Sequence, residues 1–355
     1  MGKQSARIRL NGKDHKEIRI NGKYHKLADR DSNVLWEKIA EEPIVYEGFK
    51  IRSTGFIRFH IQGNGVIDWG DGSTETFDYS ELTTVQHSSS KSLNILIKGN
   101  VIDLDFSSGT NSGRTTAYGL GAVLNELPPT MSWKTDFSYM FYNNQGASYI
   151  TINSDLFKYC VNAENFYMCF CDTSLYEIPK GLFDYCKNAK TFEMCFRNAA
   201  TYVGYADISN LFQCNTLAEN FEMCFYNYND YVLILGENTF KNCFSAKSIA
   251  GCFSHANITS IPEGFFDDMT NLENTYKAFM WCDQLKTVPY TLFDNCNKLK
   301  KVSQTFYGDK GITSKVPPLW EREWESEESY IGCYYNCINA DMTGLTDGMW
   351  IADVS

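Results

Sequence analysis

Long apolar runs are what this sequence most clearly lacks. No stretch of 18 apolar residues occurs among its 355 residues, so no segment is predicted to span a membrane. The first residues, MGKQSARIRLNGKDHK, contain no apolar core and predict no secretory signal. Position 6 is Ala rather than Ser or Thr, which argues against myristoylation of Gly2. We therefore expect the chain to remain in the compartment where it is made, unless a leader has been removed.

Proline and histidine are also scarce, at 8 and 5 residues. Low proline together with 43% apolar residues and 24 Phe argues against disorder over most of the length. A single histidine, His255, follows residue 87, which leaves few bases for nucleophilic catalysis. No phosphate-binding glycine loop, G-x-S-x-G or H-E-x-x-H motif is present, so the common catalytic signatures are missing.

Charge is unevenly distributed along the chain. The net charge is −11, yet residues 1–27 hold eight Lys or Arg against two Asp or Glu. The remainder is therefore strongly acidic. An acidic surface repels the phosphate backbone, so we predict no nucleic-acid partner.

Residues 1–45 are predicted to form a small basic β-meander. The stretches IRLNGKDHKE and IRINGKYHKL follow each other in tandem, and in both an Asn-Gly pair comes after alternating apolar residues. Asn-Gly favours a hairpin because both turn positions need positive φ. A small ribbon is marginal alone, so we expect it to anchor the chain on another protein. The candidate anchoring residues are Arg7, Arg9, Lys13, Arg19 and Lys23. Alternatively, these charges only protect exposed strand edges.

Residues 46–107 are predicted to form a β domain, with late strands at LNILIKG and VIDLDF. The loop Asp68-Trp-Gly-Asp-Gly-Ser73 resembles the WGDGS turn of PKD-like domains, which implies a β-sandwich. Two carboxylates in a glycine-rich turn could bind Ca²⁺. The alternative is a tight turn in which each Asp bonds its own backbone. Residues 108–124, rich in Ser, Thr and Gly, are predicted to be a linker.

Residues 125–355 contain an internal repeat. Pairs of Phe thirteen residues apart recur six times, and the first members of successive pairs are 26 to 29 residues apart. A third apolar or small residue lies nine positions after each first Phe. The pairs are Phe157/Phe170, Phe183/Phe196, Phe212/Phe225, Phe240/Phe253, Phe266/Phe279 and Phe293/Phe306. Such a period indicates stacked units that cannot bury an apolar face alone, with atypical copies at both ends.

Each unit is predicted to contain a short strand, a turn and a short helix. The stretch LFDNCNKLKK (292–301) has apolar residues at helical spacing. Strand-like stretches end in proline at 175–179, 258–262 and 285–289, and proline ends a strand ladder. The expected fold class is therefore α+β.

The units resemble leucine-rich repeats of the BspA-like type, found in surface proteins of Bacteroidales and in their tailed phages. The matching strings are IPKGLFDYCKNA at 178–189, IPEGFFDDMTNL at 261–272 and VPYTLFDNCNKL at 288–299. The resemblance covers about residues 125–337 and implies a solenoid preceded by the β-meander and the PKD-like sandwich. The N-terminal tandem and the following VLWEK resemble anchoring modules of phage structural proteins.

The 13 Cys are predicted to be packing residues with free thiols. Most occupy two repeat positions, and Met269 replaces Cys at one of them, which suits a small apolar site and not a nucleophile. The closest pairs, Cys169/Cys171 and Cys333/Cys337, lack the second short-spaced couple of a structural zinc site. No metal and no cofactor is predicted. Stacked cysteines could still form disulfides in an oxidising location.

The loops after each last Phe are the predicted binding face. They are variable and rich in Tyr and Asn, which suit recognition of sugars or proteins. The candidate binding residues are Tyr142, Asn143, Tyr226, Tyr228, Tyr231, Trp281 and Tyr307. The alternative is that these side chains only cap the turns.

The preferred hypothesis is a non-enzymatic virion structural protein of a tailed phage, of head or tail fibre type, made in the host cytoplasm. The basic segment would bind other virion proteins, the β domain would be a spacer, and the repeats would recognise a host-surface glycan or protein. A homo-oligomer is expected, with a trimer as one option, although no heptad pattern specifies it.

Two alternative functions remain open. One is a bacterial cell-surface BspA-like adhesin whose signal has been removed. The other is a polysaccharide depolymerase of a phage tail, since catalytic carboxylates pair in space rather than in sequence. The acidic stretch 321–328 contains five Glu, but a solvated loop explains it equally well.

Overall fold

A computed structural model gives the fold of most of the chain. It describes residues 9–10, 13–14, 17–20, 23–26, 37–38, 48–107, 123–143, 149–227 and 231–354. The chain divides into two compact units, Met1–Glu47 and Gly48–Ser355. No helix among the described residues is long and apolar enough to cross a membrane.

The N-terminal unit contains the hairpins that the tandem predicts. Its strands are β1 (Arg9–Leu10), β2 (Lys13–Asp14), β3 (Glu17–Ile20), β4 (Lys23–Lys26) and β5 (Glu37–Lys38). The β1–β2 and β3–β4 pairs are antiparallel, and β5 adds to β4. These pairs are the hairpins expected from the tandem, and the Asn-Gly residues between their strands lie outside the described residues.

The second unit begins with two long, bent strands, β6 (Phe49–Asp68) and β7 (Thr74–Asp105). Two stretches of β7 pair with β6, so that Ile67 lies between Glu75 and Ile97. Both late strands expected from the sequence are part of β7. Alternate side chains point inward, and the rings of Phe49, Phe59 and Phe106 pack together in the core.

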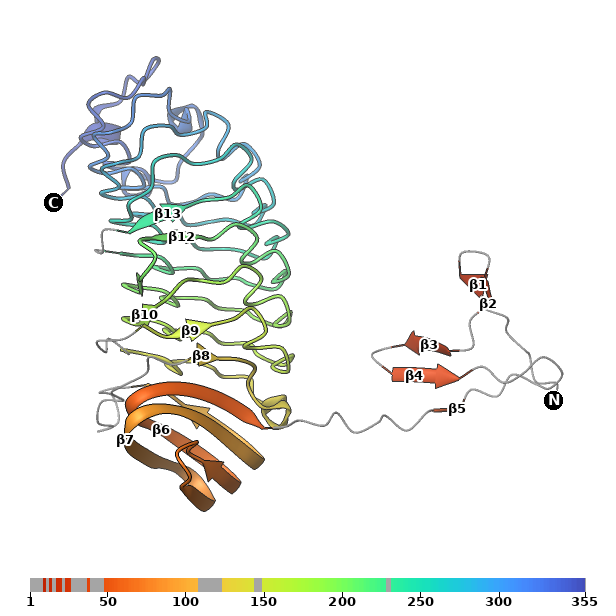
Figure 1. Ribbon diagram of the computed structural model, residues 1–355. Coiled ribbons are helices and arrows are strands. Elements are labelled where there is room, and N and C mark those ends of the chain that lie inside the picture. The colour runs from red at the N-terminus through yellow and green to blue at the C-terminus, as the bar shows by residue number, and fades with distance from the viewer. Residues whose placement is uncertain are drawn as a thin grey trace, which may run out of the picture. The chain divides into compact units, whose positions relative to one another are not determined.

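The β segment and the repeats share one sheet within the second unit, while residues 108–122 of the predicted linker lie outside the described residues. The strand β8 (Val123–Leu124) pairs with β6, and β9 (Thr151–Ile152) pairs in parallel with β8. Further coils follow in parallel, through β10 (Ser174–Leu175) with β11 (Ala200–Thr201), and β12 (Tyr205–Asp207) with β13 (Val232–Ile234). Figure 1 shows these coils stacked one on another.

Three columns of buried side chains, two of them aromatic throughout, fill the interior of the stack. The last Phe of each unit stacks on that of the next, from Phe141 to Tyr334, at centroid distances of 4.9 to 5.8 Å. The first Phe of each unit forms a second column from Phe157 to Phe293 at 5.7 to 6.0 Å. The third anchor of each unit is also fully buried, from Phe166 to Val302. The three-anchor pattern of the sequence is thus confirmed as the core.

The short helices expected in each unit are wrong. No α-helix occurs in the described residues, and the stretch 292–301 forms consecutive turns. In it, the N–H of Asp294 donates to the carbonyl of Thr291 and that of Cys296 to Phe293, at 3.0 and 2.9 Å. About ten residues are too few to nucleate a stable helix without a supporting face, because isolated helices need ~12–15.

The segment that ends on the last Phe of each unit makes a directional backbone ladder. In the unit of Phe196, Met194 (φ 54°) and Asn198 (φ 51°) have positive φ. The alternation lets the N–H groups of 192, 194, 196 and 198 donate to carbonyls of the next coil at 2.8 to 2.9 Å. Since these donors all point toward the C-terminal end, the first carbonyls and the last N–H groups need partners from outside the repeats.

Both ends of the ladder are capped by non-repeat structure. At the first coil, the N–H of Phe106 donates to the carbonyl of Met140 at 2.8 Å. At the last coil, the N–H groups of Gly332 and Tyr334 donate to the carbonyls of Met349 and Trp350 at 2.8 and 2.9 Å.

The 3₁₀ helices of the unit are η1 (Pro129–Met131), η2 (Leu319–Glu321), η3 (Glu327–Ser329) and η4 (Gly348–Ile351).

Candidate binding surfaces

The Asp-Trp-Gly-Asp-Gly-Ser loop is a self-bonded turn. The carboxylate of Asp68 accepts from the N–H two residues on, at 2.9 Å. Asp71 accepts from the N–H and hydroxyl of Ser73 at 3.0 and 2.6 Å and lies 2.8 Å from His87, whose ring stacks on Trp69. The bonds from His87 and Ser73 hold the pKa of Asp71 far below its usual value. The described residues contain no group of three His, Cys, Asp or Glu placed to hold a metal ion.

The cysteines are packing residues, as the repeat pattern predicts. All thirteen are free, and all except Cys214 are buried. Burial raises the pKa of Cys160 and Cys296 to about 12, so these thiols stay protonated near neutral pH. A protonated, enclosed thiol is a poor nucleophile and a poor metal ligand.

The structure brings four of the seven predicted loop residues into one row along the stack. Tyr142, Asn143, Tyr226 and Trp281 follow the last Phe of their units and are each half-exposed. We call this set the loop row. The ring of Tyr226 packs edge-on against His255 in the next coil, at a centroid distance of 5.5 Å. The contact with the next coil therefore covers part of the Tyr226 ring.

Two of the other predicted loop residues do not join this row as exposed side chains. Tyr231 and Tyr307 are each only 5% exposed. The hydroxyl of Tyr307 donates to Asp353 at 2.6 Å, and its ring is held against Tyr335 at 4.6 Å. Because both rings are buried to this extent, neither can present its face to a ligand. Tyr228 lies outside the described residues.

The candidate anchoring residues lie on the hairpins of the N-terminal unit. Arg9 is on β1, Lys13 on β2, Arg19 on β3 and Lys23 on β4. Arg7 lies outside the described residues. The four residues thus come from two consecutive hairpins of one small unit.

A more exposed aromatic surface lies on the outer side of the short strands. It consists of Tyr149, Tyr176, Tyr202, Tyr205, Val232 and Ile234, which are 37 to 59% exposed. We call this set the tyrosine patch. Tyr202 is at its centre, with its ring centroid 4.6 Å from that of Tyr149 and 5.4 Å from that of Tyr176. The register of β12 and β13 places Tyr205 beside Val232.

The strand geometry explains why these side chains point outward. Alternate residues of a strand face opposite sides. Leu175, Ala206 and Leu233 are buried in the stack, so their neighbours along the chain face solvent. Between β11 and β12 the chain turns at Gly204 (φ 75°), which brings two tyrosines to the surface within four residues.

Sequence reasoning missed this patch, although the sequence contains a signal for it. The tyrosines at 149, 176 and 202 recur at intervals of 27 and 26 residues, which is the repeat period. Each lies next to a buried residue at the short β-pairings, just outside the strands themselves.

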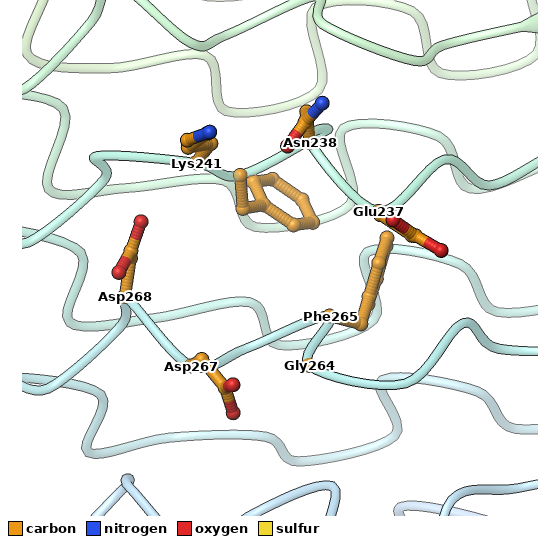
Figure 2. Close-up of a pocket in the computed structure, with 8 residues that line it drawn as sticks. Glu237, Asn238, Lys241, Gly264, Phe265, Asp267 and Asp268 are labelled. Carbon is orange, nitrogen blue, oxygen red and sulfur yellow. The ribbon is translucent and has the colours of Figure 1, made fainter.

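A small hollow opens between the coils at the turns of residues 237–241 and 264–268. Figure 2 shows its lining residues, with Asp267 and Asp268 on one coil and Asn238 and Lys241 on another. Its volume is about 160 Å³, which is below the ~300 Å³ at which ligand pockets usually begin. Asp268 already accepts a bond from the N–H of Asn242 at 2.8 Å. The hollow is thus a weaker candidate than the tyrosine patch.

Comparison of the chain with protein-family models, with curated proteins and with solved structures found no match. Function is therefore argued from the surfaces described above.

Proposed function

We propose that this chain is a non-enzymatic recognition protein in which a solenoid of leucine-rich-repeat type presents a rigid aromatic face to a surface ligand. The observation that supports it best is the tyrosine patch. Large apolar side chains are normally buried in the core, whereas these six remain exposed outside an interior that three columns of buried anchors already fill. Exposed apolar groups gathered on one face are typical of binding sites.

The backbone under the patch is fixed before any ligand arrives. Parallel pairing joins β10 to β11 and β12 to β13, and the buried columns hold each coil against its neighbours. A preformed surface loses little entropy on binding, which favours affinity. The loop row would extend the recognition surface to a second side of the same coils.

We propose further that the protein is a virion component of a tailed phage, with the basic N-terminal hairpins bound to other virion proteins. This part rests on the resemblance of the repeats and of the tandem to phage structural proteins. The concentration of Lys and Arg in residues 1–27 supports it, since a basic segment on an acidic chain favours an acidic docking partner. Attachment to a host surface and assembly as a homo-oligomer complete the proposal.

Two measurements test this function. Mass spectrometry of purified virions should detect the chain as a stoichiometric component, and its absence from the particles would defeat the virion assignment. The purified full chain, labelled with a fluorophore, should adhere saturably to Bacteroidales cells. If it adheres to no such cell, the recognition function is wrong irrespective of the virion result.

A further inference from the structure

We propose that the tyrosine patch binds a neutral glycan. The inference rests on the proposed recognition function and assigns its ligand class and its site. The patch, and not the loop row, is the primary contact.

The rings of the patch suit the apolar faces of sugar rings. Tyr149, Tyr176 and Tyr202 come from successive coils, and the ring of Tyr202 lies tilted against Tyr149 at 4.6 Å and stacked on Tyr176 at 5.4 Å, so the three form one continuous aromatic cluster. A tyrosine ring offers contact area at low entropic cost, since it has only two side-chain torsions. Three coils therefore contribute to one aromatic platform for the apolar face of a sugar.

The polar groups of the patch suit hydroxyls. No hydrogen bond of the four tyrosine hydroxyls occurs within the described residues, so each remains able to donate to and accept from a ligand. An aromatic body with a hydrogen-bonding tip matches a pyranose, which has an apolar face and a polar edge.

The charge of the patch favours an uncharged ligand. None of its six side chains is charged. At its border, Lys180 pairs with Asp207 at 2.6 Å, so the charge of this cation is already compensated. Glu177 is exposed beside Tyr176 and would repel an anion.

The size of the patch favours a glycan over a protein or a second copy of this chain. With aromatic side chains of about 150–250 Å² each and the exposed fractions above, the patch offers roughly 500 Å². A stable protein interface needs about 800 Å² on each partner. A short oligosaccharide needs much less.

Titration calorimetry of the full chain with four neutral hexasaccharides, cellohexaose, laminarihexaose, maltohexaose and mannohexaose, tests this inference. We expect saturable binding of at least one with a Kd of about 1 mM or tighter. The double variant Tyr176→Ala/Tyr202→Ala should weaken that binding at least tenfold. The matched control is Tyr185→Ala, a tyrosine that is 39% exposed and lies outside the patch. Equal melting temperatures of the variants establish that all of them fold.

Three results would overturn the glycan assignment. They are saturable binding of none of the four sugars, unchanged binding by the double variant, and equal loss of binding in the Tyr185→Ala control. The adhesion assay separates this failure from failure of the proposed function. Adhesion that survives periodate treatment of the cells but is abolished by protease would indicate a protein receptor, which leaves the recognition function intact and defeats the glycan.

Discussion

Single residues in this chain reflect the close fit between coils. Asp309 is fully buried, and its Oδ1 accepts from the N–H of Cys282 at 2.7 Å while its Oδ2 has no hydrogen-bond partner. Burial raises the pKa of Asp309 well above its usual value, which favours the protonated carboxyl in the folded protein. Gly308, next to it, adopts φ 87° against the ring of Trp281.

The substitution Asp309→Asn should raise the melting temperature, and the gain should increase with pH. The native carboxyl binds its proton more tightly than the unfolded one, so its stabilisation is complete below the unfolded pKa of ~3.9 and is lost as pH rises toward the raised native pKa. The side-chain amide of the variant does not ionise in this pH range, so it does not lose stability in this way. Melting curves from pH 4 upward measure this effect. The exposed Asp294→Asn control should show no such trend, and a gain that is constant with pH would contradict the mechanism.

Replacing Gly308 with Ala should destabilise the protein by about 1–3 kcal/mol. A Cβ at this position would lie 2.4 Å from Cε3 of Trp281, and the backbone has a positive φ that Ala disfavours. Denaturant unfolding gives the free energy. Gly348→Ala is the control, because a Cβ there meets nothing within 4 Å. Equal stabilities of the two variants would contradict the predicted clash.

At the scale of the element, the coils are joined by side chains as well as by backbone. Along one side of the stack, Glu and Lys alternate from coil to coil, two positions before the third anchor of each unit. The series is Glu164, Lys190, Glu219, Lys247, Glu273 and Lys300. Three close pairs result, with N–O distances of 2.6 to 2.7 Å. Exposed pairs contribute little each, but the alternation prevents like charges from meeting in adjacent coils.

Reversing one charge of this series should therefore lower the melting temperature. In Lys247→Glu, the new carboxylate would lie between Glu219 and Glu273, which are its neighbours in the two adjacent coils. The loss should nearly vanish at about 1 M NaCl, where the Debye length falls to about 3 Å. Lys247→Gln should lose less at low salt. A deficit of Lys247→Glu that is independent of salt would point to packing instead.

At the scale of the whole molecule, a directional stack of repeats depends on its ends. The β6–β7 segment supplies the donor for the first coil, and η4 supplies acceptors for the last coil. Lys134 and Asp103 add an ion pair of 2.9 Å between the β segment and the first coil, with both side chains under 20% exposed. Without such caps, open coil edges would be templates for association.

Replacing Trp350 with Ala should open the C-terminal end. Trp350 is 2% exposed and stacks on Tyr330 at 4.5 Å. Loss of a buried Trp typically costs about 3–5 kcal/mol. In a linear array the loss should be local, so amide exchange should rise first in the coils nearest the C-terminus and leave the β6–β7 segment protected. Uniform loss of protection along the array would contradict this view.

The sequence by itself determined the repeat, its period, the three buried anchors, the packing role of cysteine and the N-terminal hairpins. Each of these depends on local spacing or local turn chemistry, which is readable along the chain. The Asn-Gly pairs and the Phe pairs are of this kind. The prediction of helices at stretches such as 292–301 was wrong because these stretches are too short to form stable isolated helices. In the stack they form short turns, which the neighbouring coils support.

Only the tertiary structure decided which aromatics remain exposed and how the ends are closed. Tyr231 and Tyr176 are both tyrosines near strand ends, yet the first is buried and the second is exposed. That difference depends on which side of the coil each faces and on what the next coil covers. The joining of β6 to β8 likewise pairs residues more than 70 positions apart, from Ile51 to Leu124, which no local pattern encodes.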